Sequence, residues 1–192
     1  MGFFGEYRAT RRDERELGEG VWRRAHDRFK RGLDRYHQIL ESVRDPELRA
    51  AAVPLANELA DLLPRVRAVC MEAHGRAPSQ TQDIPHSTSG YLSDVHRQLS
   101  RAGNAMAQTA EALTMARFTA QGTGHAGPAG APGTPARNSP TRPVAGADAA
   151  GAPEHPESSS AGVGSIRRRS AVVAEYVAAA EELMASHASS RF

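Results

Sequence analysis

The chain has 192 residues, of which 40% are hydrophobic and 5% aromatic, enough for one domain of typical size with a small core of Leu, Val and Ala. The formal net charge is +2, so the chain as a whole lacks the strong positive field that indicates a nucleic-acid-binding protein. Cys70 is the only cysteine, which excludes an internal disulfide and a cysteine-based metal cluster.

Residues 1–20 predict an N-terminal tail or a short helix. They contain no apolar run of the kind found in a secretory signal peptide, and no stretch of the chain approaches the roughly 18 apolar residues of a transmembrane helix. We therefore expect a cytoplasmic protein. Phe3 and Phe4 stand ahead of several arginines, and such a tip can contact an anionic membrane surface or pack on the end of a bundle.

Three long helices are predicted between residues 21 and 121, because mostly apolar residues recur at spacings of three and four, with one gap of seven between Trp22 and Phe29. The first stripe consists of Trp22, Phe29, Leu33, Tyr36, Leu40 and Val43. The second consists of Leu48, Ala52, Leu55, Leu59, Leu62, Val66, Val69 and Ala73. The third consists of Leu92, Val95, Leu99, Ala102, Met106, Thr109, Leu113 and Ala116.

The connections between these helices follow from local residue types. Asp45 can cap the second helix and Pro46 suits its first position, which predicts a short turn and two antiparallel helices. The apolar stripe keeps its register through Pro54 and Pro64, so we expect one bent helix, with two shorter helices as the alternative. Gly75 is typical of a helix end, and the long connection that follows is expected to cross an end of the domain.

Residues 122–165 predict a disordered linker, because 34 of these 44 residues are Gly, Ala, Pro, Ser or Thr. Residues 166–192 then predict one amphipathic helix. Its larger apolar side chains are the candidates for binding a partner protein: Val173, Tyr176, Val177, Leu183 and Met184.

The predicted fold is all-α, an antiparallel three-helix bundle followed by the linker and the C-terminal helix. Because three helices can bury their stripes against one another, the last helix is not needed to complete a core. It is expected to dock in a groove of a partner, on its own bundle or on a sister bundle, and the oligomeric state stays open.

A basic face is predicted on the first helix, where four arginines recur at spacings of four, three and four: Arg24, Arg28, Arg31 and Arg35. Such a face can contact RNA or acidic lipid headgroups. It can also be a solvated face on which Asp27 and Asp34 pair with the arginines, and the sequence favours this alternative. No aromatic residue lies on the face to stack on bases, which weakens the case for nucleic acid.

Ser170 follows three arginines, and this string resembles the site preference of basophilic protein kinases. A phosphate there is expected to lie at the start of the last helix, where the helix dipole and free amides favour it. The alternative is a helix cap preceded by solubilising charge.

No cofactor, metal or catalytic residue is predicted. The eight histidines are scattered and form no pair at metal-binding spacing, and the Gly-rich stretch lacks the strand and Lys of a phosphate loop. The sequence predicts a non-enzymatic protein–protein interaction module or scaffold with a tethered docking helix. The alternative is a peripheral binder of anionic membranes or RNA through Phe3, Phe4 and the arginine face.

Overall fold

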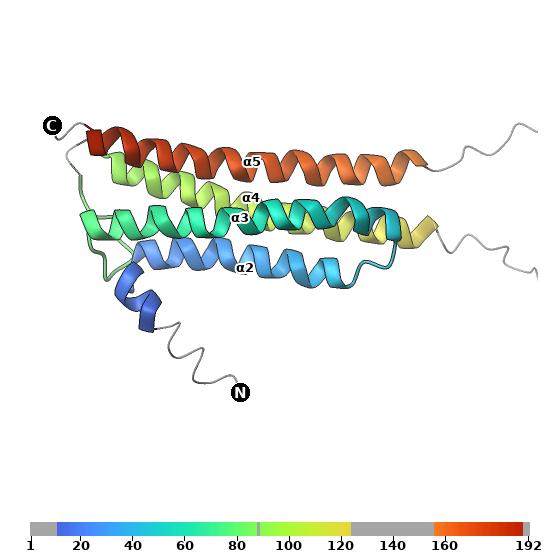
Figure 1. Ribbon diagram of the computed structural model, residues 1–192, viewed down its shortest axis with the longest axis horizontal. Helices are drawn as coiled ribbons and strands as arrows, with labels where there is room; N and C mark the ends of the chain where they lie inside the picture. Colours follow the sequence, from blue (N-terminus) through green and yellow to red (C-terminus); the bar gives the residue numbers. More distant parts are fainter. Residues whose placement is uncertain (1–10, 88, 124–155, 190–192) are drawn as a thin grey trace, which may run out of the picture.

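The computed structural model describes residues 11–87, 89–123 and 156–189, and this part of the chain contains helices and no strands (Figure 1). Residues 11–17 are helical. Four long helices follow: α2 (Val21–Glu41), α3 (Pro46–Arg76), α4 (Tyr91–Thr123) and α5 (Pro156–Ser189). The prediction of an all-α fold is confirmed.

The four long helices form one bundle in which each helix has two main neighbours (Figure 1). α2 packs against α3 and α4, and α5 packs against the same two helices from the other side. α3 and α4 lie on one diagonal of the bundle and make few contacts. α2 and α5 lie on the other diagonal and make no backbone-level contact within the described residues. The order around the bundle is therefore α2, α3, α5, α4.

α2 and α4 run parallel to each other, although sequence neighbours in the bundle are antiparallel. Near the middle of the bundle, Gly32 lies so close to Met106 that an added Cβ would be 2.8 Å from its Cγ. Towards the ends of both helices, Arg117 donates a hydrogen bond to the Ser42 hydroxyl. The α3–α4 connection must consequently cross the diagonal at one end of the bundle, which explains its length.

The structure corrects the prediction of a three-helix bundle with a separate C-terminal helix, because α5 is a fourth wall of the bundle. α4 and α5 pack antiparallel, with Tyr91 stacked on His187 at one end and Gly162 against Ala116 at the other. The inward side chains of α5 are at most 1% exposed: Ile166, Val173, Val177, Ala180 and Met184. Gly162 lets α5 approach α4 closely, because an added Cβ there would lie 3.1 Å from the Ala116 side chain.

The start of α5 also differs from the expected boundary. The helix begins at Pro156, ten residues before the predicted start at residue 166. Val163 packs against the core and Ile166 is 1% exposed, so tertiary burial outweighs the low helix propensity of this Ser- and Gly-rich stretch. The remainder of the predicted linker, residues 124–155, lies outside the described residues.

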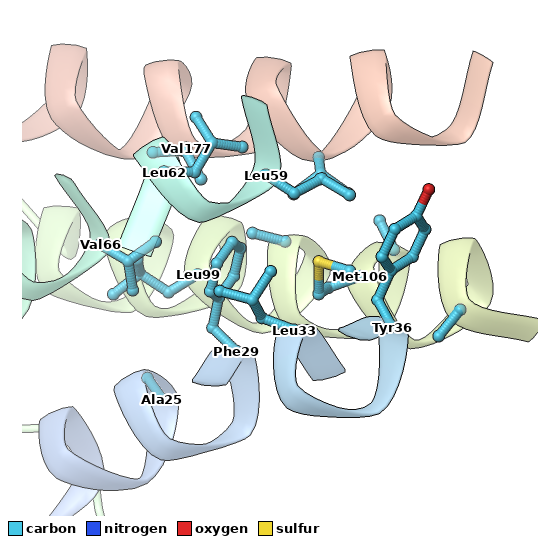
Figure 2. Close-up of a cluster of buried hydrophobic side chains, with 14 of the residues drawn as sticks. Ala25, Phe29, Leu33, Tyr36, Leu59, Leu62, Val66, Leu99, Met106 and Val177 are labelled. Carbon is cyan, nitrogen blue, oxygen red and sulfur yellow. The ribbon is translucent and has the colours of Figure 1, made fainter. Parts of the chain in front are cut away.

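The predicted apolar stripes form the core, as Figure 2 shows for its central part. Trp22, Phe29 and Tyr36 of α2 are all 0% exposed. The Tyr36 hydroxyl donates a hydrogen bond to the Ala52 carbonyl of α3 at 3.2 Å, and burial raises the pKa of this phenol. The side chains gathered around Tyr36 and Phe29 in Figure 2 include Leu33, Leu59, Leu62, Val66, Leu99, Met106 and Val177.

The turn between α2 and α3 has the predicted cap. The Asp45 carboxylate accepts a hydrogen bond from the Leu48 amide at 2.6 Å, and a proline occupies the first turn of α3. α3 is one helix that continues through Pro54 and Pro64, as expected. It ends at Arg76, so Gly75 lies inside its last turn and does not cap it.

The α3–α4 connection closes the end of the bundle over the start of α2. Ser79 is 5% exposed. Its hydroxyl accepts a hydrogen bond from the Val21 amide at 3.4 Å. No side chain at the start of α2 caps this helix end. The Trp22 indole N–H donates to the Ala77 carbonyl at 3.0 Å. These bonds anchor the loop and satisfy polar groups at the helix start.

Gly20 is required by this closure, and Gly20→Ala is expected to lower the free energy of unfolding by about 1–3 kcal/mol. The added Cβ would lie 2.4 Å from the backbone oxygen of Ser79, which cannot move without displacing the loop. Thermal denaturation checks this value. Gly75→Ala is the matched control: a Cβ there meets nothing within 4 Å, so this variant should gain about 0.5–1 kcal/mol. Equal effects of the two substitutions would contradict the packing of this loop.

Candidate functional site

A groove of about 570 Å³ runs along the surface between α2 and α4. Residues with small side chains on both helices let the two backbones approach each other, so the bottom of the groove lies close to the backbone. Residues from both helices line what we call the α2/α4 groove: Arg28, Arg31, Gly32, Arg35, Ile39, Gly103, Asn104, Ala107, Ala110, Glu111, Thr114 and Met115.

Three of the four predicted arginines form one wall of the α2/α4 groove, namely Arg28, Arg31 and Arg35. All three are exposed, and none makes an ion pair with another described residue. Arg24 is exposed as well but does not line the groove. The prediction of one basic face is thus refined to a three-arginine wall.

Neither Asp27 nor Asp34 forms an ion pair with a groove arginine within the described residues. Asp27 pairs instead with Arg23 at 3.1 Å and with His26 at 3.2 Å. The pKa of His96 is lowered mainly by the partial burial of its ring and, to a smaller extent, by the positive charge of Arg28. Among the described residues that line the groove, Glu111 alone is acidic. The three arginines of the wall therefore outnumber the one acidic residue of the groove lining.

The far end of the groove is apolar. Met115 lines it and is 69% exposed, and Phe118 lies one turn further along α4 at 55% exposure. The Arg117 guanidinium lies 4.9 Å from the centre of the Phe118 ring and also donates to the Ser42 hydroxyl. This arrangement holds the ring beside the groove end.

The α4 half of the groove had a partial signal in the sequence. Gly103, Ala107 and Ala110 stand beside the third apolar stripe and indicate close helix approach. Met115 and Phe118 flank stripe positions without belonging to them, and large apolar side chains outside a stripe are the signal that identifies this end.

The predicted partner-binding residues of α5 face the protein's own core. Val173, Val177 and Met184 are at most 1% exposed, and Tyr176 and Leu183 are partly buried against the core. The Arg65 guanidinium of α3 holds the Glu181 carboxylate with two hydrogen bonds of 2.9 and 2.6 Å. A partner can use this apolar side only after α5 leaves the bundle.

Ser170 is not at the start of a helix, because α5 begins well before it. The side chain is 5% exposed and its hydroxyl donates to the Arg167 carbonyl at 2.9 Å. A cavity of about 130 Å³ beside it is lined by Leu59, Leu62 and Glu58 of α3. A phosphate on Ser170 would therefore not lie at a helix start, as the sequence predicted, but in a confined space next to the Glu58 carboxylate.

Ser170→Glu is expected to lower the free energy of unfolding by about 2 kcal/mol, because it places a charge in a confined, buried site where Glu58 repels it and Arg167 offsets only part of the cost. Ser186→Glu is the control: it makes the same change on the exposed side of α5 and should cost within about 0.5 kcal/mol. Urea denaturation compares the two. If both variants matched the unmodified chain, Ser170 would not be buried in solution.

A second cavity, of about 500 Å³, lies between residues 11–17, α2 and α3. Its charges are largely paired within the protein. Arg67 reaches Asp13 and Glu16 at 2.6 Å each, and the hydrogen bonds from Arg67 and Arg12 lower the pKa of the Glu16 carboxyl. This cluster fastens the N-terminal helical segment to α3 and leaves less free charge than the α2/α4 groove does.

Cys70 is fully buried, and burial raises the pKa of its thiol to about 12, which keeps it protonated and unreactive. The described residues contain no group of three or more His, Cys, Asp or Glu side chains that could hold a metal ion. Among the helices of the described chain, none is long and apolar enough to cross a membrane. Phe3 and Phe4 lie outside the described residues.

No family model matches the chain, and no match was found among curated proteins or among solved structures.

Proposed function

We propose that the chain is a non-enzymatic protein–protein interaction module that binds an acidic segment of a partner protein in the α2/α4 groove. One observation carries this function: Arg28, Arg31 and Arg35 are exposed, free of ion pairs with described residues, and aligned along one wall of a groove. The class of function is the one expected from the sequence, and the binding surface is a different one.

The chemistry of the wall favours a carboxylate-bearing ligand. Arg28 and Arg35 are separated by about 10 Å along α2, at 1.5 Å per residue, and Arg31 lies between them. Guanidinium groups bind carboxylates through paired N–H donors. Because arginine stays protonated at all pH values at which proteins fold, these groups are suited to holding an anion and unsuited to exchanging a proton with a substrate.

Two other anionic partners fit this surface less well. Binding of single-stranded RNA commonly uses aromatic side chains that stack on bases. No aromatic residue lies along the three-arginine wall, and Phe118, beyond the end of the groove, has Arg117 against its ring. A bilayer presents its anionic headgroups to a broad face of a protein, whereas these arginines lie in one row along one wall of a groove. An acidic protein segment can enter the groove, so we favour it over both.

The tethered-helix alternative would use the apolar side of α5. It requires α5 to leave the bundle, which exposes Val173, Val177 and Met184 and breaks the Arg65–Glu181 pair. The α2/α4 groove needs no such rearrangement, which supports it as the binding surface.

Binding of fluorescein-labelled poly-L-glutamate to the full chain tests the proposal. The variant Arg28→Gln/Arg31→Gln/Arg35→Gln is expected to bind about tenfold more weakly, because it loses three charge-assisted contacts. The control Arg167→Gln/Arg168→Gln/Arg169→Gln removes the same charge from three exposed positions of α5 and should change the affinity little.

Two outcomes would contradict the proposal. Equal losses in both triple variants would mean that poly-L-glutamate responds to net charge and not to the groove. Tighter binding of a single-stranded RNA or of phosphatidylserine vesicles, with the same dependence on the three groove arginines, would replace the acidic protein segment by that ligand.

A further inference from the structure

The two most exposed large apolar side chains of the described residues lie together near the end of α4. Met115 and Phe118 are 69% and 55% exposed, whereas Val53 and Met71 on α3 are 38% exposed each. The two most exposed side chains are three residues apart on α4, so they share a face and adjoin each other. Exposed apolar side chains that cluster beside a groove mark a binding surface.

This apolar cluster continues the arginine wall along the groove. α2 and α4 are parallel, so Ile39 and Met115 line the same end, about 16 Å along α2 from Arg28 at 1.5 Å per residue. The groove is thus basic along Arg28, Arg31 and Arg35 and carries Met115 at this end, where Thr114 and Glu111 of α4 also line it.

The apolar end is also held in place. Arg117 lies against the Phe118 ring and is itself tied to Ser42 at the end of α2. Because Arg117 links the two helices, the Phe118 ring is positioned before a ligand arrives. A preformed surface lowers the entropy that binding must overcome.

We propose that the α2/α4 groove recognises an amphipathic acidic helix of a partner protein. Its carboxylates pair with Arg28, Arg31 and Arg35, and one or two large apolar side chains about three turns further along pack on Met115 and Phe118. This inference rests on the proposed function and adds the apolar anchor and its position. A helix of about 11 residues spans the distance from Arg28 to the apolar end.

The two halves of the groove contribute differently to binding. Exposed ion pairs add little affinity each and weaken with salt, so the arginines provide orientation and fast association. Burial of one large apolar side chain raises affinity by about tenfold or more and does not weaken with salt. The apolar anchor therefore carries the larger share of affinity at physiological ionic strength.

Two designed peptides test the inference by fluorescence polarisation against the full chain. Both are fluorescein-labelled helices of about 16 residues with glutamates at spacings of three and four. One carries Leu and Phe about three turns beyond the first glutamate, and the other carries Ser at both positions. We expect the anchored peptide to bind about tenfold more tightly.

Variants of the chain locate the effect. Met115→Ser/Phe118→Ser is expected to remove the preference for the anchored peptide and to leave binding of the Ser-containing peptide unchanged. Val53→Ser/Met71→Ser removes two exposed apolar side chains of α3 and should keep the preference. All four positions are exposed, and circular dichroism melting curves verify that each variant is folded.

The outcomes separate the inference from the proposed function. If both peptides bound equally and both required the groove arginines, the apolar anchor would be overturned and the proposed function would stand. If neither peptide nor poly-L-glutamate bound, both would fall. If Met115→Ser/Phe118→Ser weakened binding to phosphatidylserine vesicles and left the anchored peptide unaffected, the cluster would serve a membrane and the inference would be overturned.

Discussion

Val177→Asp is expected to lower the free energy of unfolding by about 4 kcal/mol and the melting temperature by about 10 °C. Val177 is 0% exposed, and Figure 2 shows it in the core cluster that also contains Leu59 and Leu62 of α3. A carboxylate at this position is buried among apolar side chains without a hydrogen-bond donor for it. Thermal denaturation followed by circular dichroism measures the effect.

The neighbouring residue supplies the control. Ala178 is exposed on α5, so Ala178→Asp introduces the same charge one position away and should change the free energy of unfolding by less than about 0.5 kcal/mol. If Val177→Asp and Ala178→Asp had the same free energy of unfolding, α5 would not pack on the bundle in solution.

Removal of residues 156–192 is expected to have a still larger effect. It uncovers the sides of α3 and α4 that α5 buries with Ile166, Val173, Val177 and Met184, so the remaining chain loses much of its core. We expect the shortened chain to melt at least about 15 °C lower, with a broad transition. Differential scanning calorimetry measures both quantities.

A peptide of residues 156–192 provides the complementary test. Added to the shortened chain above its Kd, it should raise the melting temperature with the logarithm of its concentration, as a bound fourth helix would. An unchanged melting temperature after truncation would instead support the separate docking helix that the sequence predicted.

The sequence predicted α2, α3 and α4 because their large apolar residues repeat at helical spacing. Trp22, Phe29 and Tyr36 can be buried together only on one side of a helix, and the structure buries them there. The cap formed by Asp45 was predicted from the same local chemistry, and it is confirmed by its hydrogen bond with Leu48.

The packing of α5 was not predicted because its stripe is poor in large side chains. Ala180 is as fully buried as Val173 and Val177, yet an alanine gives little hydrophobic signal in the sequence. A signal existed on the partner helix: Ala105 and Ala110 are buried on α4, although neither belongs to its predicted stripe. Together with the main stripe they make the apolar side of α4 too wide for two neighbours.

The site was predicted only in part for a similar reason. The spacing of Arg28, Arg31 and Arg35 identified one wall, since that wall lies on a single helix. The opposite wall comes from α4, and its register against α2 depends on contacts such as Gly32 with Met106, which tertiary packing determines. Asp27 was expected to pair with the arginines of the basic face, but it pairs with Arg23 instead.

The location of binding is tested most directly by an NMR titration of the ¹⁵N-labelled full chain with the anchored acidic peptide. We expect amide shift changes at Gly32, at Gly103 and in the segments around residues 28–39 and 103–118. The amides of residues 166–184 should keep their positions, because α5 stays packed. Shift changes concentrated in residues 166–184, with residues 28–39 unaffected, would contradict binding in the α2/α4 groove and identify α5 as the docking element.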